Sequence, residues 1–182
     1  TMVTFHPDPE IFQVTTIYKY DTLAGRLREL AYLNKGIHLS LTDRRTLVND
    51  VDENGNELET QHYRSDVFYS KEGLREFVDY LDGGAEKLIE SPIYLETDKI
   101  IPIEIALQYN TSYTEKIYSY VNNINTIEGG THLQGFKMGL TRTLKNYADK
   151  QGMLAKLKFD LAADDFREGL TAVVSVKVAE PQ

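Results

Sequence analysis

One stretch of the sequence sets most of what this chain can fold into: a glycine pair that leads into a long amphipathic segment. Gly129 and Gly130 let the backbone turn sharply, and Thr131 is suited to accept a hydrogen bond from the first free N–H groups of a helix. At about 100° of rotation per residue, five apolar side chains of the segment fall within roughly 80° of one another: Leu133, Phe136, Leu140, Leu144 and Tyr147. The sequence therefore predicts a helix over residues 131–150 that buries one narrow apolar stripe.

Alternating apolar residues on both sides of this helix predict strands. The alternation covers residues 101–109, 117–121 and 170–178. Pro102 has no N–H to donate to a ladder, so its strand should begin there or lie at a sheet edge. The turn at residues 110–112 predicts that the first two runs form an antiparallel pair. Strands of period two next to a helix of period 3.6 indicate an α+β fold.

The first half of the chain carries weaker signals of the same kind. Residues 1–6 alternate like a short strand, and Asp21 is a good N-cap for a helix that ends at Gly36. A half-buried strand follows over residues 37–42, and Asn54-Gly55 predicts an exposed hairpin within residues 44–65. Ser70 should cap a second helix, which Gly83-Gly84 ends.

Composition excludes several classes of protein. The chain has 182 residues, 41% of them hydrophobic, which is enough for one substantial core or one domain and part of another. It has no cysteine, so a disulfide framework and a thiolate metal site are excluded, in keeping with a reducing cytoplasm. No apolar run approaches the ~20 residues that a membrane-spanning helix needs.

The net charge of −8 is unevenly distributed. Residues 50–90 hold twelve acidic and four basic residues, a balance of −8, so the rest of the chain is neutral. The segment from His132 to Lys158 holds one acid, Asp149, and six bases: Lys137, Arg142, Lys145, Lys150, Lys156 and Lys158. A chain with this much negative charge is not expected to bind DNA well by itself. The six bases form either a local DNA-facing surface or an ordinary solvated helix face.

Three further groups of residues are candidate sites. Glu128-Gly129-Gly130-Thr131 precedes a helix, as in a phosphate cradle, but it lacks the P-loop lysine and Glu128 would repel a phosphate; a structural turn is favoured. The four histidines, His6, His38, His62 and His132, have no paired metal-ligand spacing. Asp164, Asp165 and Glu168 are better explained as helix-capping carboxylates than as a cation site. The residues alone therefore predict no metal site.

Three segments resemble, in order and spacing, the ATPase half of bacterial type II topoisomerases, and specifically the transducer domain of the DNA gyrase B family. They are Arg26–Gly36, with the sequence RLRELAYLNKG; Asn122–His132, with NNINT and EGGTH; and Arg167–Val178, with REGLTAVVSVKV. The motif of the second segment is Gly129, Gly130, Thr131 and His132, and it is the presence of all three segments in register that makes the resemblance strong. The resemblance covers nearly the whole chain.

The resemblance implies a fold and a division into domains. Residues 1–43 would be the last strand–helix–strand of a GHKL ATPase domain, and residues 44–182 would be a two-layer transducer domain. In the family, the strand before Asn122, the helix over 131–150 and the strand over 170–178 form a ribosomal-protein-like βαβ unit with a left-handed crossover. Crossover connections of this kind are generally right-handed. The left-handed crossover is therefore expected from the resemblance and not from general physical rules.

The resemblance also implies a function. Members of the family are cytoplasmic, nucleoid-associated DNA topoisomerases. They hydrolyse ATP with Mg²⁺ and introduce negative supercoils by double-strand passage, as a homodimer of B subunits with the gyrase A subunit. The transducer couples nucleotide state to closure of a clamp around DNA.

On the resemblance, the family's catalytic glutamate, its magnesium ligand and its Gln-Thr-Lys loop would lie outside residues 1–182. We therefore expect no catalytic residue in this chain and no cofactor bound to it. Thr1 matches a threonine of the family's adenine pocket. The DNA-facing bases would be Lys137, Arg142, Lys145 and Lys150, whereas Ile127 stands where some members have an arginine. Two alternatives are a topoisomerase IV B subunit and a non-catalytic interaction module of the same fold.

Overall fold

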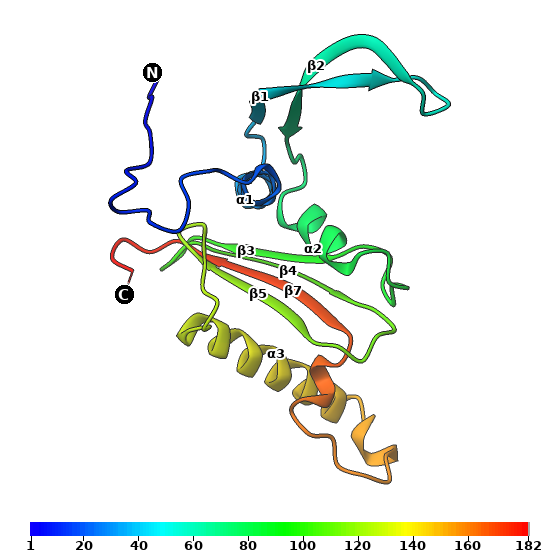
Figure 1. The fold of residues 1–182 in the computed structure, drawn as a ribbon. Helices are drawn as coiled ribbons and strands as arrows, with labels where there is room; N and C mark the ends of the chain where they lie inside the picture. The colour runs from blue at the N-terminus through cyan, green and yellow to red at the C-terminus, as the bar shows by residue number, and fades with distance from the viewer. Residues whose placement is uncertain (182) are drawn as a thin grey trace. The chain divides into compact units, whose positions relative to one another are not determined.

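The computed structural model describes residues 1–181, and the chain divides into two compact units (Figure 1). We call residues 1–31 and 37–69 the N-terminal unit, and residues 32–36 together with the chain from Ser70 onward the sheet unit. The predicted domain boundary near residue 44 falls within a strand of the N-terminal unit and stays a prediction.

The N-terminal unit consists of a helix and a long hairpin. Helix α1 spans Tyr20–Leu33, and strands β1 (Leu39–Val51) and β2 (Glu57–Phe68) pair antiparallel. A small core joins them, made of Tyr20, Ala24, Ala31 and Phe68 with Leu27, Leu39 and Leu41 packed around it. The distal half of the hairpin is exposed, as predicted from Asn54-Gly55; its turn is fixed by the Asp52 carboxylate, which accepts hydrogen bonds from the N–H groups of Asn54 and Asn56.

Two predictions for this unit are wrong. Residues 1–6 form no strand, and Met2, Val3 and Phe5 are exposed; alternation gives a strand only where a neighbouring strand supplies the hydrogen-bond ladder, and none of the described strands pairs with this segment. Asp21 is not the N-cap, because helix α1 already begins at Tyr20. Its carboxylate instead makes an ion pair with Arg64, at 2.6 Å.

The sheet unit is built on five strands in the order β3-β4-β7-β5-β6. They are β3 (Ile93–Thr97), β4 (Ile103–Tyr109), β5 (Lys116–Val121), β6 (Ile124–Asn125) and β7 (Leu170–Val176). Helices α2 (Leu74–Asp82) and α3 (Thr131–Lys150) accompany them, with 3-10 turns η1 (Leu154–Lys156) and η2 (Asp165–Arg167) between α3 and β7. The α+β class is confirmed, and β4 begins directly after Pro102, as predicted.

The expected pairing of the strands on either side of residues 110–112 is wrong. Strands β4 and β5 run in opposite directions, but neither bonds to the other, because β7 lies between them. β7 is antiparallel to β4 and parallel to β5, so Val174 stands opposite both Ile105 and Ser119. All seven residues of β7 are buried, as befits the central strand. The β5–α3–β7 segment is thus a parallel crossover; its left hand stays a prediction.

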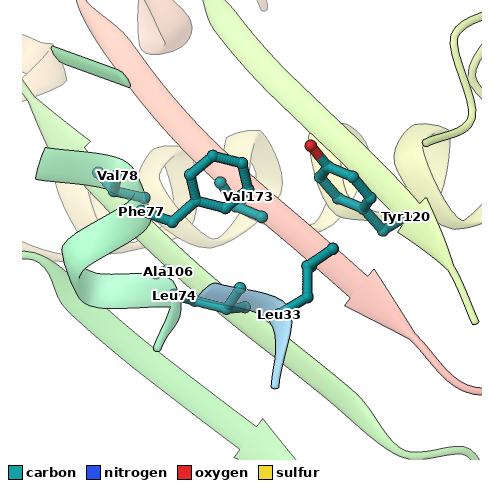
Figure 2. Close-up of a cluster of buried hydrophobic side chains, with 7 residues drawn as sticks. All are labelled: Leu33, Leu74, Phe77, Val78, Ala106, Tyr120 and Val173. Carbon is teal, nitrogen blue, oxygen red and sulfur yellow. The ribbon is translucent and has the colours of Figure 1, made fainter. Parts of the chain in front are cut away.

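Helices cover both faces of this sheet (Figure 1). On one face α2 packs against the strands in a cluster made of Leu33, Leu74, Phe77, Val78, Ala106, Tyr120 and Val173 (Figure 2). On the other face Phe136 and Leu140 of α3 pack on Leu107, Leu170 and Ala172. Neighbouring residues in a strand point to opposite faces, so Ala106 and Leu107 serve different clusters. The sheet and the helices on its two faces make three layers, one more than the two-layer arrangement that the resemblance implies.

Helix α3 has the predicted bounds but is less buried than its stripe suggests. None of its side chains is fully buried, and Tyr147 is 58% exposed, so this residue does not belong to the packed stripe. Thr131 is not the cap either. The N-cap is Gly130, with φ of 154° and no side-chain cap hydrogen bond.

Candidate functional site

A strongly charged concave surface lies along α3. It is a groove of about 580 Å³ between this helix and the chain that enters β7. Its lining residues are Gln134, Gly135, Lys137, Met138, Gly139, Thr141, Arg142, Lys145, Asn146, Ala163 and Arg167. Four cations therefore meet in one hollow.

Helix geometry explains why these cations gather. Lys137, Thr141 and Lys145 are spaced four residues apart, so they lie one above another on the same face of the helix, with Arg142 beside them. Lys150 lies in the last turn and is not part of the groove. Three of the four predicted DNA-facing bases are thus brought together, and the fourth is not.

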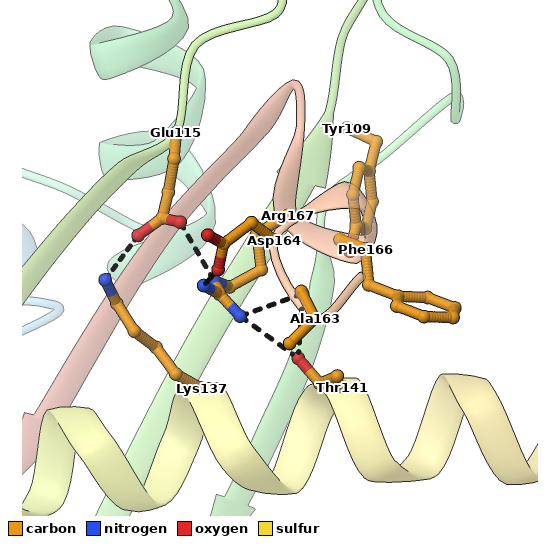
Figure 3. Close-up of polar contacts among 8 residues, drawn as sticks. All are labelled: Tyr109, Glu115, Lys137, Thr141, Ala163, Asp164, Phe166 and Arg167. Atoms are coloured by element: carbon orange, nitrogen blue, oxygen red, sulfur yellow. Dashed lines mark hydrogen bonds and ion pairs between the residues drawn. The ribbon is translucent and has the colours of Figure 1, made fainter. Parts of the chain in front are cut away.

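A carboxylate that no sequence pattern singles out pairs with two of these cations. Glu115, just before β5, makes ion pairs with both Lys137 and Arg167 (Figure 3). The distance from Arg167 Nε to Glu115 Oε2 is 2.9 Å. Burial raises the pKa of the Glu115 carboxyl, but hydrogen bonds and charges from Lys137 and Arg167 outweigh it, so the pKa lies below its usual value.

Arg167 is the hub of these contacts, and its side chain is only 11% exposed. Besides Glu115 it pairs with Asp164, donates to the carbonyl oxygen of Ala163 at 2.9 Å and donates to Thr141 Oγ1 at 3.2 Å (Figure 3). It thereby joins α3, the η2 turn and the start of β5. In the sequence Arg167 stands out only as the first residue of a motif. Its contacts could not be predicted, because its partners do not follow it at helix or strand spacing.

The cations of α3 differ in whether a carboxylate pairs with them. Within residues 1–181, Arg142, Lys145 and Lys150 make no ion pair, whereas Lys137 is neutralised by Glu115. The groove therefore offers Arg142 and Lys145 to an outside anion, and Lys137 only in competition with Glu115.

The glycine motif at the start of α3 is an anchor. His132 Nε2 lies 3.2 Å from Thr126 Oγ1, and this hydroxyl donates to the carbonyl oxygen of Ser119 in β5, at 2.9 Å. Burial lowers the pKa of the His132 imidazole. Gly129 turns with φ of 83° and packs on Leu133, 3.2 Å from where a Cβ would stand. The motif thus fixes the helix start to the sheet, in line with the predicted structural turn.

The other candidate residues form no site in the described part of the chain. Asp164 pairs with Arg167, and Asp165 accepts a hydrogen bond from the N–H of Ala162, at 2.8 Å. Among residues 1–181, no three His, Cys, Asp or Glu side chains are grouped so that they could hold a metal ion.

None of the helices described in residues 1–181 is long and apolar enough to cross a membrane. Thr1 is exposed, and its role in ATP binding stays a prediction.

Comparison with known proteins identifies the family. The model of the family described as DNA gyrase B matches residues 73–182. The chain belongs to the DNA gyrase B family. Curated DNA gyrase B subunits align over its whole length: that of Cytophaga hutchinsonii is 60% identical over 184 residues, and that of Cytophaga aurantiaca is 58% identical.

Solved structures of DNA gyrase B share the fold. The 43K ATPase domain of Thermus thermophilus gyrase B, solved in complex with an aminocoumarin, superposes with a TM-score of 0.76 at 35% identity. The match covers 97% of this chain and 44% of that one. The chain spans 36% of the length of the two Cytophaga DNA gyrase B subunits, so it corresponds to about a third of a family member.

Proposed function

We propose that this chain is part of the B subunit of a DNA gyrase, an ATP-hydrolysing type II topoisomerase that introduces negative supercoils by double-strand passage. The observation that carries the proposal is the alignment of the entire chain, at 60% identity, with a DNA gyrase B subunit. The protein would act in the cytoplasm with ATP and Mg²⁺, as a homodimer of B subunits that joins gyrase A subunits on DNA.

Within that protein, the sheet unit would transmit nucleotide state to the DNA clamp. Two features support this role. The β5–α3–β7 crossover is anchored at two points, by Thr126 and His132 at the start of α3 and by Arg167 beside its middle turns. A helix held in this way moves with its sheet as one body, so a displacement of the sheet would move the groove as well.

The groove would meet DNA through its unpaired cations. The chain as a whole carries −8, so its attraction to DNA is local and depends on Arg142 and Lys145. Arginine and lysine contacts to phosphate release counterions, and the affinity therefore falls steeply with salt. Lys150, on the last turn, would add a peripheral contact.

The activity is tested on the intact protein that contains this chain, combined with its A subunit. We expect it to convert relaxed plasmid to negatively supercoiled plasmid only when ATP and Mg²⁺ are present. Relaxation and decatenation without negative supercoiling would instead identify a topoisomerase IV. No ATP-dependent change in DNA topology would contradict both and favour a non-catalytic interaction module.

The groove is tested separately by fluorescence anisotropy of a labelled duplex with the 182-residue chain. Replacing both Arg142 and Lys145 by glutamine should flatten the dependence of log affinity on log salt by up to about 1.8, since each phosphate contact contributes about 0.9. The matched control replaces Lys71 and Lys99, two exposed lysines outside the groove, and should leave the slope unchanged.

A further inference from the structure

We propose that Glu115 is an acidic latch that holds Lys137 back from DNA phosphates and so sets the DNA affinity of the α3 groove. The inference rests on the proposed function, because it concerns the same groove. It assigns the residue a tuning role beyond structural support.

The geometry makes Lys137 the exchangeable partner of Glu115. Glu115 uses one oxygen for Lys137 and the other for Arg167 (Figure 3). Arg167 has three further acceptors, on Asp164, Ala163 and Thr141, whereas the described contacts of Lys137 consist of Glu115 alone. Loss of the carboxylate charge therefore leaves Arg167 held in place but sets Lys137 free.

The pair is accessible to a competing anion. The side chains of Lys137 and Glu115 are 26% and 29% exposed, and Lys137 lines the groove. Partly exposed ion pairs are weak because water screens them, so Lys137 can turn towards a phosphate held by neighbouring cations once the charge of Glu115 is removed. Arg142 and Lys145 supply those neighbouring cations in the same groove.

The charge balance of the groove points the same way. Its four cations, Lys137, Arg142, Lys145 and Arg167, face two carboxylates, Glu115 and Asp164, which leaves a balance of +2. Neutralising Glu115 raises this balance to +3 and also releases a mobile cation. An ion pair with only a structural role would change DNA binding through this charge alone, whether or not Lys137 is present, whereas the latch predicts a gain that depends on Lys137.

The test is a cycle of four proteins: the 182-residue chain, Glu115→Gln, Lys137→Gln and the double variant. Binding of a labelled duplex is measured by anisotropy between 50 and 200 mM salt. Glu115→Gln should bind more tightly and steepen the salt slope by about 0.9, which corresponds to an additional loss of about 3.5-fold in affinity across that range. The double variant should lose this gain. Lys137→Gln alone should barely alter the slope, because the latched lysine does not contact DNA.

The control is Glu90→Gln, which changes the net charge equally at an exposed position outside the groove and should leave the slope unchanged. Thermal unfolding of each variant confirms that it is folded. If the Glu115→Gln variant does not fold, Lys137→Gln is compared with the parent chain instead. A salt slope that is flatter by about 0.9 in Lys137→Gln would show that Lys137 already contacts DNA and would overturn the latch.

The outcomes separate the latch from the function on which it rests. If the Arg142 and Lys145 double variant flattens the slope while Glu115→Gln leaves it unchanged, the latch is wrong and the DNA-facing groove stands. If neither changes the slope, the groove is not the DNA contact and both proposals fail.

Discussion

At the scale of single residues, Gly169 at the entry to β7 is the described glycine that leaves the least room for a side chain. Gly169 has φ of 70°, and a Cβ there would stand 2.3 Å from the carbonyl oxygen of Asn110 and 2.7 Å from that of Ser112. The N–H of Asn110 also donates to the Gly169 carbonyl oxygen, at 2.9 Å, so the two backbones cannot separate freely. Only glycine fits this crossing.

We expect Gly169→Ala to lower the free energy of unfolding by about 3 kcal/mol or more, since it combines backbone strain with a backbone clash. The measurement is urea unfolding followed by circular dichroism. The matched control is Gly139→Ala on α3, where nothing outside the adjacent residues and the helix's own backbone lies within 4 Å of the added Cβ. That change should instead stabilise the chain by up to about 1 kcal/mol through helix propensity. Equal effects at the two positions would contradict this account.

His132 should make stability depend on pH near neutrality. Burial lowers its pKa in the folded chain below the usual 6.5, so the unfolded chain takes up a proton first as the pH falls. Stability should therefore decline as the pH drops through 6.5 and stop declining below the folded pKa. Urea titrations at pH 7.5 and 5.5 check this, and His132→Gln should show a smaller decline between the two. An equal decline in both proteins would exclude His132 as its source.

At the scale of elements, α3 combines a well-defined start with shallow packing. We expect Leu140→Ala to cost about 1–2 kcal/mol, below the range of about 2–5 kcal/mol for a fully buried leucine, because this side chain is only partly buried against the sheet. Tyr147→Ala, at a 58% exposed position of the same helix, should change the free energy of unfolding by less than about 0.5 kcal/mol. Comparable losses would mean that the whole predicted stripe is core.

The elements also show which parts of the structure the sequence could predict. The bounds of α3 are confirmed because a glycine turn and a 3.6-residue period coincide there, and the end of α2 is confirmed at Gly83, which adopts φ of 62°. The position of β7 was missed because local alternation says nothing about which strand lies beside which. The latch was missed for the same reason, since Glu115 and Lys137 meet only through the tertiary fold.

At the scale of the whole molecule, we expect the 182-residue chain alone neither to hydrolyse ATP nor to bind it measurably. Thr1 is its one proposed nucleotide contact, and a single hydrogen bond contributes about 1 kcal/mol, whereas micromolar affinity needs about 8 kcal/mol. Calorimetric titration with magnesium and a non-hydrolysable ATP analogue checks this. Micromolar binding would reveal a nucleotide site within these residues and overturn the expectation.

The central place of β7 has a consequence for how the chain acquires its structure. Among the described strands β7 is the last in chain order, yet β4 and β5 are joined only through it, and Tyr109 pairs with Leu170, which is synthesised much later. During synthesis on the ribosome, β4, β5 and α3 therefore emerge before the strand that unites them. Their apolar surfaces stay open until it arrives, and such long-range pairing is slow. The sheet unit can therefore complete its core only after β7 has been synthesised.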